Sequence, residues 1–128
     1  MKICVSAVSG SLDSQIDPRF GRCQYFVLVD SETMTFEVIA NASKGALHGA
    51  GIQAARIVSG RGVEVVLTGN IGPNAFQVLS SAGIKVMTGV VGTVREAIER
   101  YQRGELEEAD SPTSGGHFGI GSRRGRRW

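Results

Sequence analysis

No hydrophobic run in this 128-residue sequence approaches the roughly 20 apolar residues that a membrane-spanning helix requires. The first ten residues, MKICVSAVSG, lack the long apolar core and the cleavage site of a signal peptide, so we expect them to form a strand. The chain has two cysteines and no C-x-x-C pair, which excludes a disulfide framework. These absences predict a cytoplasmic protein with free thiols and no membrane partner.

Signatures of catalysis are also scarce. The apolar run 2–8 has no acidic residue and the run 63–69 has only Glu64, whereas a two-metal nuclease needs clustered carboxylates. There is no G-x-S-x-G elbow, and neither GNIGPN nor GVVGT carries the Lys-Ser/Thr pair of a P-loop. The sequence therefore predicts a protein that is not an enzyme. A nucleotide-binding regulator that uses TGNIGPN stays open as an alternative.

The positive charge is confined to one end of the chain. Residues 1–118 carry ten Lys/Arg and twelve Asp/Glu, a net charge of −2, whereas residues 119–128 carry four arginines and no acid. From residue 105 the composition becomes acidic, then Ser/Pro/Gly-rich, then Arg/Gly-rich. We therefore expect a folded domain over 1–104 and a disordered tail over 105–128.

Hydrophobic patterning over 1–104 predicts alternating strands and helices. The short link between the second and third strands indicates an antiparallel hairpin, and the later strand–helix units predict that the first, fourth and fifth strands are parallel. The expected architecture is α/β, with a five-stranded mixed sheet in the order β-β-β-α-β-α-β-α and helices on both faces. Strands are expected at 2–8, 25–30, 34–41, 63–69 and 84–89, and helices at 49–62, 73–83 and 93–104.

Glycine-rich turns precede all three predicted helices. Ligands of open α/β sheets collect at the carboxyl ends of the parallel strands, where the loop 9–23 and two of these turns should meet. Glycine allows close approach to the backbone, and helix N-termini attract anions. We therefore expect an anion site built from the backbone of the turns, at Gly49, Gly69, Asn70, Ile71, Gly72, Pro73, Asn74 and the stretch from Gly89 to Thr93.

Three side chains, those of Cys4, Cys23 and His48, are of the types that bind soft or borderline metals. Cys4 lies in a buried run and is expected to be a core residue. Cys23 either lies at the mouth of the expected site or simply begins the second strand. His48 is either a turn residue or a ligand. A thiolate and an imidazole both suit soft or borderline metals, but one of each does not complete a four-ligand site.

Two stretches, DPRFGRCQYFVLVD (17–30) and the run from HGAG to GIKVM (48–87), resemble the dinitrogenase iron–molybdenum cofactor biosynthesis family. This family includes small nitrogenase-accessory domains that are NifX- and NafY-like. The resemblance covers about residues 1–104. It implies a ribonuclease H-like fold and a role in nitrogen fixation, as an accessory to cofactor assembly.

The resemblance also implies a cargo. Accessory members carry the iron–molybdenum cofactor or its iron–sulfur precursor, and a related protein holds a molybdenum–copper sulfide cluster non-covalently. The implied role is a carrier of an anionic metal cluster that works with cluster donor or acceptor proteins. By this resemblance Arg19, Arg22 and His48 would line the site, with Cys23 as an extra ligand.

A second hypothesis comes from the tail. A ribonuclease H-like body without catalysis would then act as a protein- or nucleic-acid-interaction module through its basic end. Nucleic acid would be bound by the tail alone, since the body is acidic.

Overall fold

A central five-stranded sheet organises the protein. The computed structural model describes residues 1–113, so the expected disorder of residues 114–128 and the tail-based interaction module lie outside the described residues. The strands are β1 (Lys2–Ala7), β2 (Tyr25–Asp30), β3 (Phe36–Ala40), β4 (Val65–Leu67) and β5 (Lys85–Met87); the helices are η1 (Phe20–Arg22, a 3₁₀ turn), α1 (Ala50–Ser59), α2 (Pro73–Ser81) and α3 (Val94–Gln102).

The sheet has the order β3-β2-β1-β4-β5. Strands β2 and β3 pair antiparallel, as the hairpin prediction required, and β1 also pairs antiparallel with β2. Strand β1 runs parallel to β4, and β4 parallel to β5. The α/β class and the five-stranded mixed sheet are therefore confirmed. Strand β1 lies in the middle, which explains its nearly unbroken apolar sequence.

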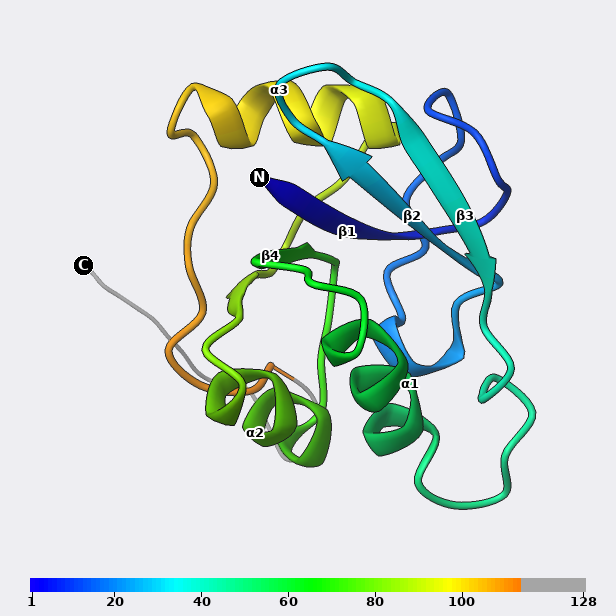
Figure 1. The fold of residues 1–128 in the computed structure, drawn as a ribbon. Coiled ribbons are helices and arrows are strands. Elements are labelled where there is room, and N and C mark those ends of the chain that lie inside the picture. The colour runs from blue at the N-terminus through cyan, green and yellow to red at the C-terminus, as the bar shows by residue number, and fades with distance from the viewer. Residues whose placement is uncertain (114–128) are drawn as a thin grey trace.

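The helices cover both faces of the sheet, as predicted (Figure 1). Helices α1 and α2 pack on one face, over a core that includes Phe20, Phe26 and Leu79. Helix α3 packs on the opposite face, over a core to which Leu12 and Ile16 of the first loop contribute. Helix α3 is therefore separated by the sheet from α1 and α2.

Residues 105–113 correct part of the tail prediction. They do not leave the domain at residue 105 but run back along the sheet edge. Glu108 forms a bridge with Met87, and the Ala109 N–H donates to the carbonyl of Val86 at 2.8 Å. Since β5 is an edge strand, its free backbone groups give this acidic segment a partner that its composition did not reveal.

No helix within residues 1–113 has the length and apolar character needed to cross a membrane.

Candidate functional site

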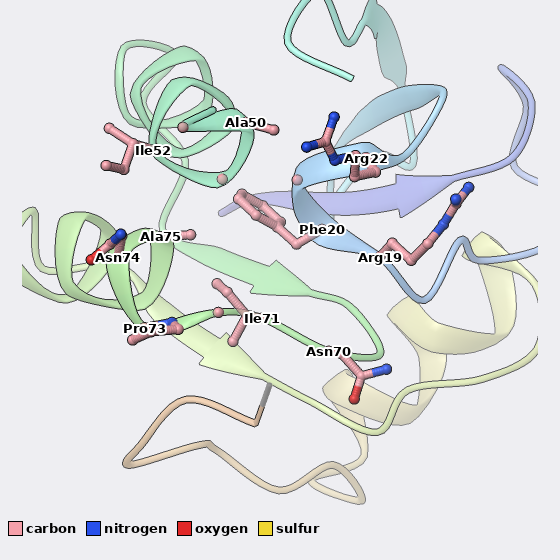
Figure 2. A pocket seen from close by; sticks show the side chains of 14 residues that line it. Arg19, Phe20, Arg22, Ala50, Ile52, Asn70, Ile71, Pro73, Asn74 and Ala75 are labelled. Carbon is pink, nitrogen blue, oxygen red and sulfur yellow. The ribbon is translucent and has the colours of Figure 1, made fainter. Parts of the chain in front are cut away.

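A pocket of about 570 Å³ opens on the α1 and α2 side of the sheet (Figure 2). Three segments distant in sequence form it: the η1 turn in the first loop, the start of α1, and the turn that leads from β4 into α2. The aromatic ring of Phe20 points inward toward Ile71 and Ala75, and all three side chains are buried. The fourteen lining residues are Arg19, Phe20, Gly21, Arg22, Gly49, Ala50, Gly51, Ile52, Asn70, Ile71, Gly72, Pro73, Asn74 and Ala75.

The first turn of helix α1 lines this pocket. Its N-cap is Gly49, whose φ of 72° lies in the left-handed region that glycine adopts without strain. The Gln53 N–H donates to the Gly49 carbonyl at 3.0 Å, so the N–H groups of residues 50–52 precede the first bond of the helix. All three of these residues line the pocket.

The first turn of helix α2 lines the same pocket, across from the start of α1. Its N-cap is Gly72, and Pro73 occupies the first helical position, where the missing N–H costs nothing. The Phe76 N–H donates to the Gly72 carbonyl at 3.0 Å, which leaves the amides of Asn74 and Ala75 at the pocket. The positive ends of two helix dipoles thus meet at one cavity.

Capping distinguishes these two helices from the third. Among the described residues, no side chain caps the N-terminus of α1 or α2. Helix α3 instead has a complete capping box, in which the Thr93 hydroxyl accepts from the Glu96 N–H at 3.1 Å and the Glu96 carboxylate accepts from the Thr93 N–H at 2.9 Å. The helix ends that open on the pocket are the ones that keep their donors available.

Glycines bring the three pocket segments together. A Cβ atom on Gly21 would lie 2.9 Å from the Cα of Gly51, and one on Gly51 would lie 3.3 Å from the Cβ of Ala75. The first distance is shorter than real Cβ contacts allow, so η1 and α1 can touch only because residue 21 has no side chain.

Arg19 lies at the rim of the pocket and is held by the buried carboxylate of Asp17. Its Nε and Nη2 donate to the two carboxylate oxygens of Asp17, each at 3.2 Å, and its backbone N–H donates to Oδ1 at 3.0 Å. The bond to Asp17 raises the pKa of Arg19, so the guanidinium stays charged. Asp17 is itself held by Ser6, whose hydroxyl donates to the Asp17 carbonyl at 2.6 Å.

Arg22 stands at the rim nearer to α1. Its Nη1 donates to the carbonyls of Lys44 and Ala46, at 2.8 and 2.7 Å. These bonds tie the exposed loop that leads into α1 to the η1 turn. Arg19 and Arg22 both come from the η1 side, while Asn70 and Asn74 come from the α2 side (Figure 2).

Eight of the predicted site residues meet at this pocket: Arg19, Arg22, Gly49, Asn70, Ile71, Gly72, Pro73 and Asn74. The sequence analysis missed Phe20, Gly21 and residues 50–52 and 75. The alternation of small residues in GAGIQAA is the one local signal of close packing at the start of α1.

Three predicted residues, Gly69, Gly89 and Thr93, do not line this pocket. Gly69 is buried against the first loop, where a Cβ atom would lie 2.7 Å from the Cα of Pro18. Gly89 and Thr93 belong to the turn that starts α3, whose body packs on the opposite face. The sequence could not show this separation, because a glycine turn after a parallel strand does not reveal which face of the sheet the next helix covers.

Cys23 does not line the pocket either. It is fully buried just before β2, and Asn41 Nδ2 lies 3.7 Å from its sulfur. Burial is the main cause that raises the pKa of Cys23 to about 12, so it is a neutral thiol near pH 7. Burial likewise raises the pKa of Cys4, which confirms that residue as part of the core.

His48 lies beside the pocket and not in it. It is exposed, one residue before Gly49, and its neighbour Leu47 is 90% exposed. Among residues 1–113, no group of three or more His, Cys, Asp or Glu side chains is arranged to hold a metal ion. The groups that the pocket does offer are amide N–H donors, guanidinium groups, amide side chains and an apolar floor.

Several known proteins are similar to this chain in sequence or in fold. The protein MJ0580 of Methanocaldococcus jannaschii is 30% identical over 112 residues, which cover 84% of this chain and 95% of that protein. The apo form of the orange protein from Desulfovibrio gigas superimposes with a TM-score of 0.86 at 45% identity, covering 88% and 96% of the two chains. The Thermotoga protein TM1290 superimposes with a TM-score of 0.78 at 36% identity, covering 90% and 98%.

The family model described as dinitrogenase iron-molybdenum cofactor matches residues 1–104. This range contains every strand and helix of the structure and every residue that lines the pocket. The resemblance seen in the sequence is thereby confirmed: the chain belongs to the dinitrogenase iron–molybdenum cofactor family.

Proposed function

We propose that this protein is a non-enzymatic carrier of an anionic, sulfide-rich metal cluster, which it binds non-covalently in the pocket between η1, α1 and α2. The observation that carries the proposal is the pair of uncapped helix N-termini that face one cavity. Iron–sulfur, iron–molybdenum and other molybdenum–sulfide clusters fit this description, and the family and its orange-protein neighbour support a metal-cluster cargo.

The charge of the pocket favours an anion. Each helix N-terminus acts as roughly half a positive charge and stabilises a nearby anion by about 0.3–1 kcal/mol. Arg19 and Arg22 add two full charges at the rim. Backbone N–H groups converging on one cavity resemble the concave anion sites that proteins build without charged side chains.

The size and floor of the pocket favour a polyatomic guest. Its volume of about 570 Å³ falls within the roughly 300–1,000 Å³ of small-molecule sites and far exceeds the space that one ion needs. Phe20, Ile71 and Ala75 make the floor apolar. Weakly hydrated sulfide faces can rest against such a floor, while the rim donors meet the anionic charge.

Hydrogen-bond donors of the pocket hold the cluster, and cysteine does not ligate its metal atoms. A thiol with a pKa of about 12 does not supply a thiolate at neutral pH, and Cys23 does not line the pocket. The cargo is therefore a preformed cluster that a donor protein delivers and an acceptor protein removes.

We also propose that the fold is ribonuclease H-like. The sheet order, with β2 antiparallel beside β1, supports this assignment.

Tetrathiomolybdate, a molybdenum sulfide dianion, tests the proposal. The full chain is incubated with it without oxygen, freed of excess by gel filtration, and analysed for molybdenum and visible absorption. We expect retained molybdenum in the wild type, and at least tenfold weaker binding (about 1.4 kcal/mol) in the double variant Arg19→Gln/Arg22→Gln.

The matched control is Arg61→Gln/Arg95→Gln. It removes the same charge from exposed arginines that pair with Glu37 and Asp13 and do not line the pocket. The control should bind like the wild type. A wild type that elutes without molybdenum, or a control that loses as much affinity as the rim variant, refutes the proposal.

A further inference from the structure

The segment from residue 105 to residue 113 passes along the edge of the sheet and ends at the wall of the pocket (Figure 1). It starts after α3, and its Leu106 packs against the core on the α3 side of the sheet. It then pairs with β5 through Glu108 and Ala109, and Thr113 contacts Ile71, which lines the pocket. The family match ends at residue 104, so this contact comes from a part of the chain outside the matched range.

Thr113 binds both backbone groups of Ile71. The Thr113 N–H donates to the Ile71 carbonyl at 3.0 Å, and the Thr113 hydroxyl accepts from the Ile71 N–H at 2.9 Å. Ile71 is only 1% exposed, and within residues 1–113 its N–H has no other hydrogen-bond partner. Thr113 therefore satisfies a buried donor in the wall of the pocket, and leaving such a donor unpaired destabilises the wall.

The preceding residue, Asn70, ties the same turn to the first loop. The Asn70 N–H donates to the Pro18 carbonyl at 2.7 Å, and the Phe20 N–H donates to the Asn70 carbonyl at 3.3 Å. The turn from β4 into α2 is thus bonded through residue 70 to the first loop and through residue 71 to Thr113. The next residue, Gly72, is the N-cap of α2, so these bonds fix the point from which α2 starts.

The position of this start decides how well α2 meets an anion. The attraction of a helix N-terminus for an anion falls off within the first turn of the helix. A site whose donors are already in place also loses less entropy when its guest binds. Thr113 does not itself line the pocket, so any effect on the guest acts through Ile71.

We propose that Thr113 is a positioning residue of the pocket and that its attachment to Ile71 is coupled to occupancy of the pocket by an anion. This inference rests on the proposed function, because the coupling needs an anionic guest. A guest that binds better to the fixed wall than to the loosened wall must in turn hold Thr113 in place, because coupling between two sites is reciprocal.

The first test measures the affinity of full-length variants for tetrathiomolybdate, by titration without oxygen. Thr113→Val removes the hydroxyl that accepts from Ile71 and keeps the backbone N–H and nearly the same size. Thr113→Ser keeps both groups. We expect at least threefold weaker binding by the valine variant and binding within twofold of wild type by the serine variant.

Thr33→Val is the matched control. The Thr33 hydroxyl also accepts from a backbone N–H, that of Thr35 at 3.2 Å, but it lies in the turn between β2 and β3 and does not line the pocket. This variant should bind within twofold of wild type.

Hydrogen exchange gives a second readout, which a merely structural role of Thr113 would not change. Exchange of the Thr113 amide, followed by NMR, should be at least threefold slower in the wild type loaded with tetrathiomolybdate than in the empty protein. The reference is the Asp30 amide, which donates to the Thr35 carbonyl at 2.9 Å in the β2–β3 hairpin and should exchange equally in both states.

The outcomes separate this inference from the carrier proposal. Suppose that the wild type retains molybdenum. Wild-type affinity in Thr113→Val, an equal loss in Thr33→Val, or a Thr113 amide that does not respond to loading then overturns the positioning role, and the carrier proposal stands. If the wild type retains no molybdenum, both are wrong.

Discussion

Arg19 is 63% exposed at the rim of the pocket, yet it is held by Asp17, whose side chain is only 4% exposed. The two residues share two side-chain hydrogen bonds and one backbone hydrogen bond. The anchoring acid is fixed in turn to β1, since the Asp17 N–H donates to the Ser6 carbonyl at 3.0 Å. A charged group on the rim is thereby positioned by the centre of the sheet.

Asp17→Ala should lower the free energy of unfolding. It removes the charged acceptor of the Arg19 backbone N–H, and a hydrogen bond to a charged group contributes roughly 1.5–3 kcal/mol. Urea denaturation followed by circular dichroism measures the change. Asp13→Ala is the control, because Asp13 is 82% exposed and its pairing with Arg95 is a surface contact, so less than about 0.5 kcal/mol is expected. Equal effects of the two substitutions would contradict the anchoring role.

Gly21→Ala should damage both stability and the pocket. The new methyl would lie 2.9 Å from the Gly51 Cα and 3.0 Å from the Gly51 nitrogen, so η1 must move away from α1. Overpacking of this kind costs about 1–3 kcal/mol. Thermal unfolding and tetrathiomolybdate binding together measure the outcome.

Gly45→Ala is the matched comparison for that substitution. Gly45 belongs to the exposed loop before α1, and a Cβ atom there would meet nothing within 4 Å. The unfolding free energy of this variant and its affinity for tetrathiomolybdate should stay near the wild-type values. Loss of stability at residue 45 as large as at residue 21 would show that the loop, and not the contact of η1 with α1, is sensitive to glycine replacement.

Asn74→Asp should change stability and binding in opposite directions. Asn74 is the second residue of α2 and lines the pocket, so an aspartate there complements the helix dipole and stabilises the fold by about 0.3–1 kcal/mol. The same charge repels an anionic guest, and tetrathiomolybdate affinity should fall at least tenfold.

The control for that variant is Asn74→Ala, which removes the amide without adding charge. It should bind several times better than Asn74→Asp. If the aspartate variant binds as well as the alanine variant, the electrostatic account of the pocket is wrong.

Stability should decline in alkaline solution because of the buried thiols. Burial raises the pKa of Cys23 from its ordinary value of 9.0 to about 12, so folding favours the protonated form. That contribution is complete below pH 9 and is lost between pH 9 and about 12, because the unfolded chain releases the proton first. The free energy of unfolding should fall by up to about 1.4 kcal/mol per pH unit in this window.

Urea denaturation of wild type and Cys23→Ala at pH 8 and pH 10 checks this expectation. The variant should lose less stability between the two pH values than the wild type. At pH 8 the native protein should also resist alkylation by iodoacetamide, and the denatured chain should react at both cysteines. Parallel pH dependence in the two proteins, or rapid labelling of the native thiols, would contradict the burial of Cys23.

Much of the fold could be read from local patterns. Periodicity located all five strands and three long helices, and the short link after Asp30 correctly predicted the antiparallel hairpin. Eight of the fourteen pocket residues could also be predicted, because glycine turns before 50 and 73 and the arginines of DPRFGR are visible in the sequence. The sequence left the position of Cys23 open, because it lies in a polar loop and its burial depends on β2 and on Asn41, eighteen residues away.

The sequence by itself determined the alternation of strands and helices, the glycine starts of α1 and α2, and the separation of acidic body from basic end. Only the tertiary structure decided that α3 packs on the far face, where Leu12 and Ile16 complete its core, and thus takes no part in the pocket. It also decided that residues 105–113 return to Ile71. These facts depend on contacts between segments far apart in the chain, and hydrophobic periodicity records which face of an element is buried but not what buries it.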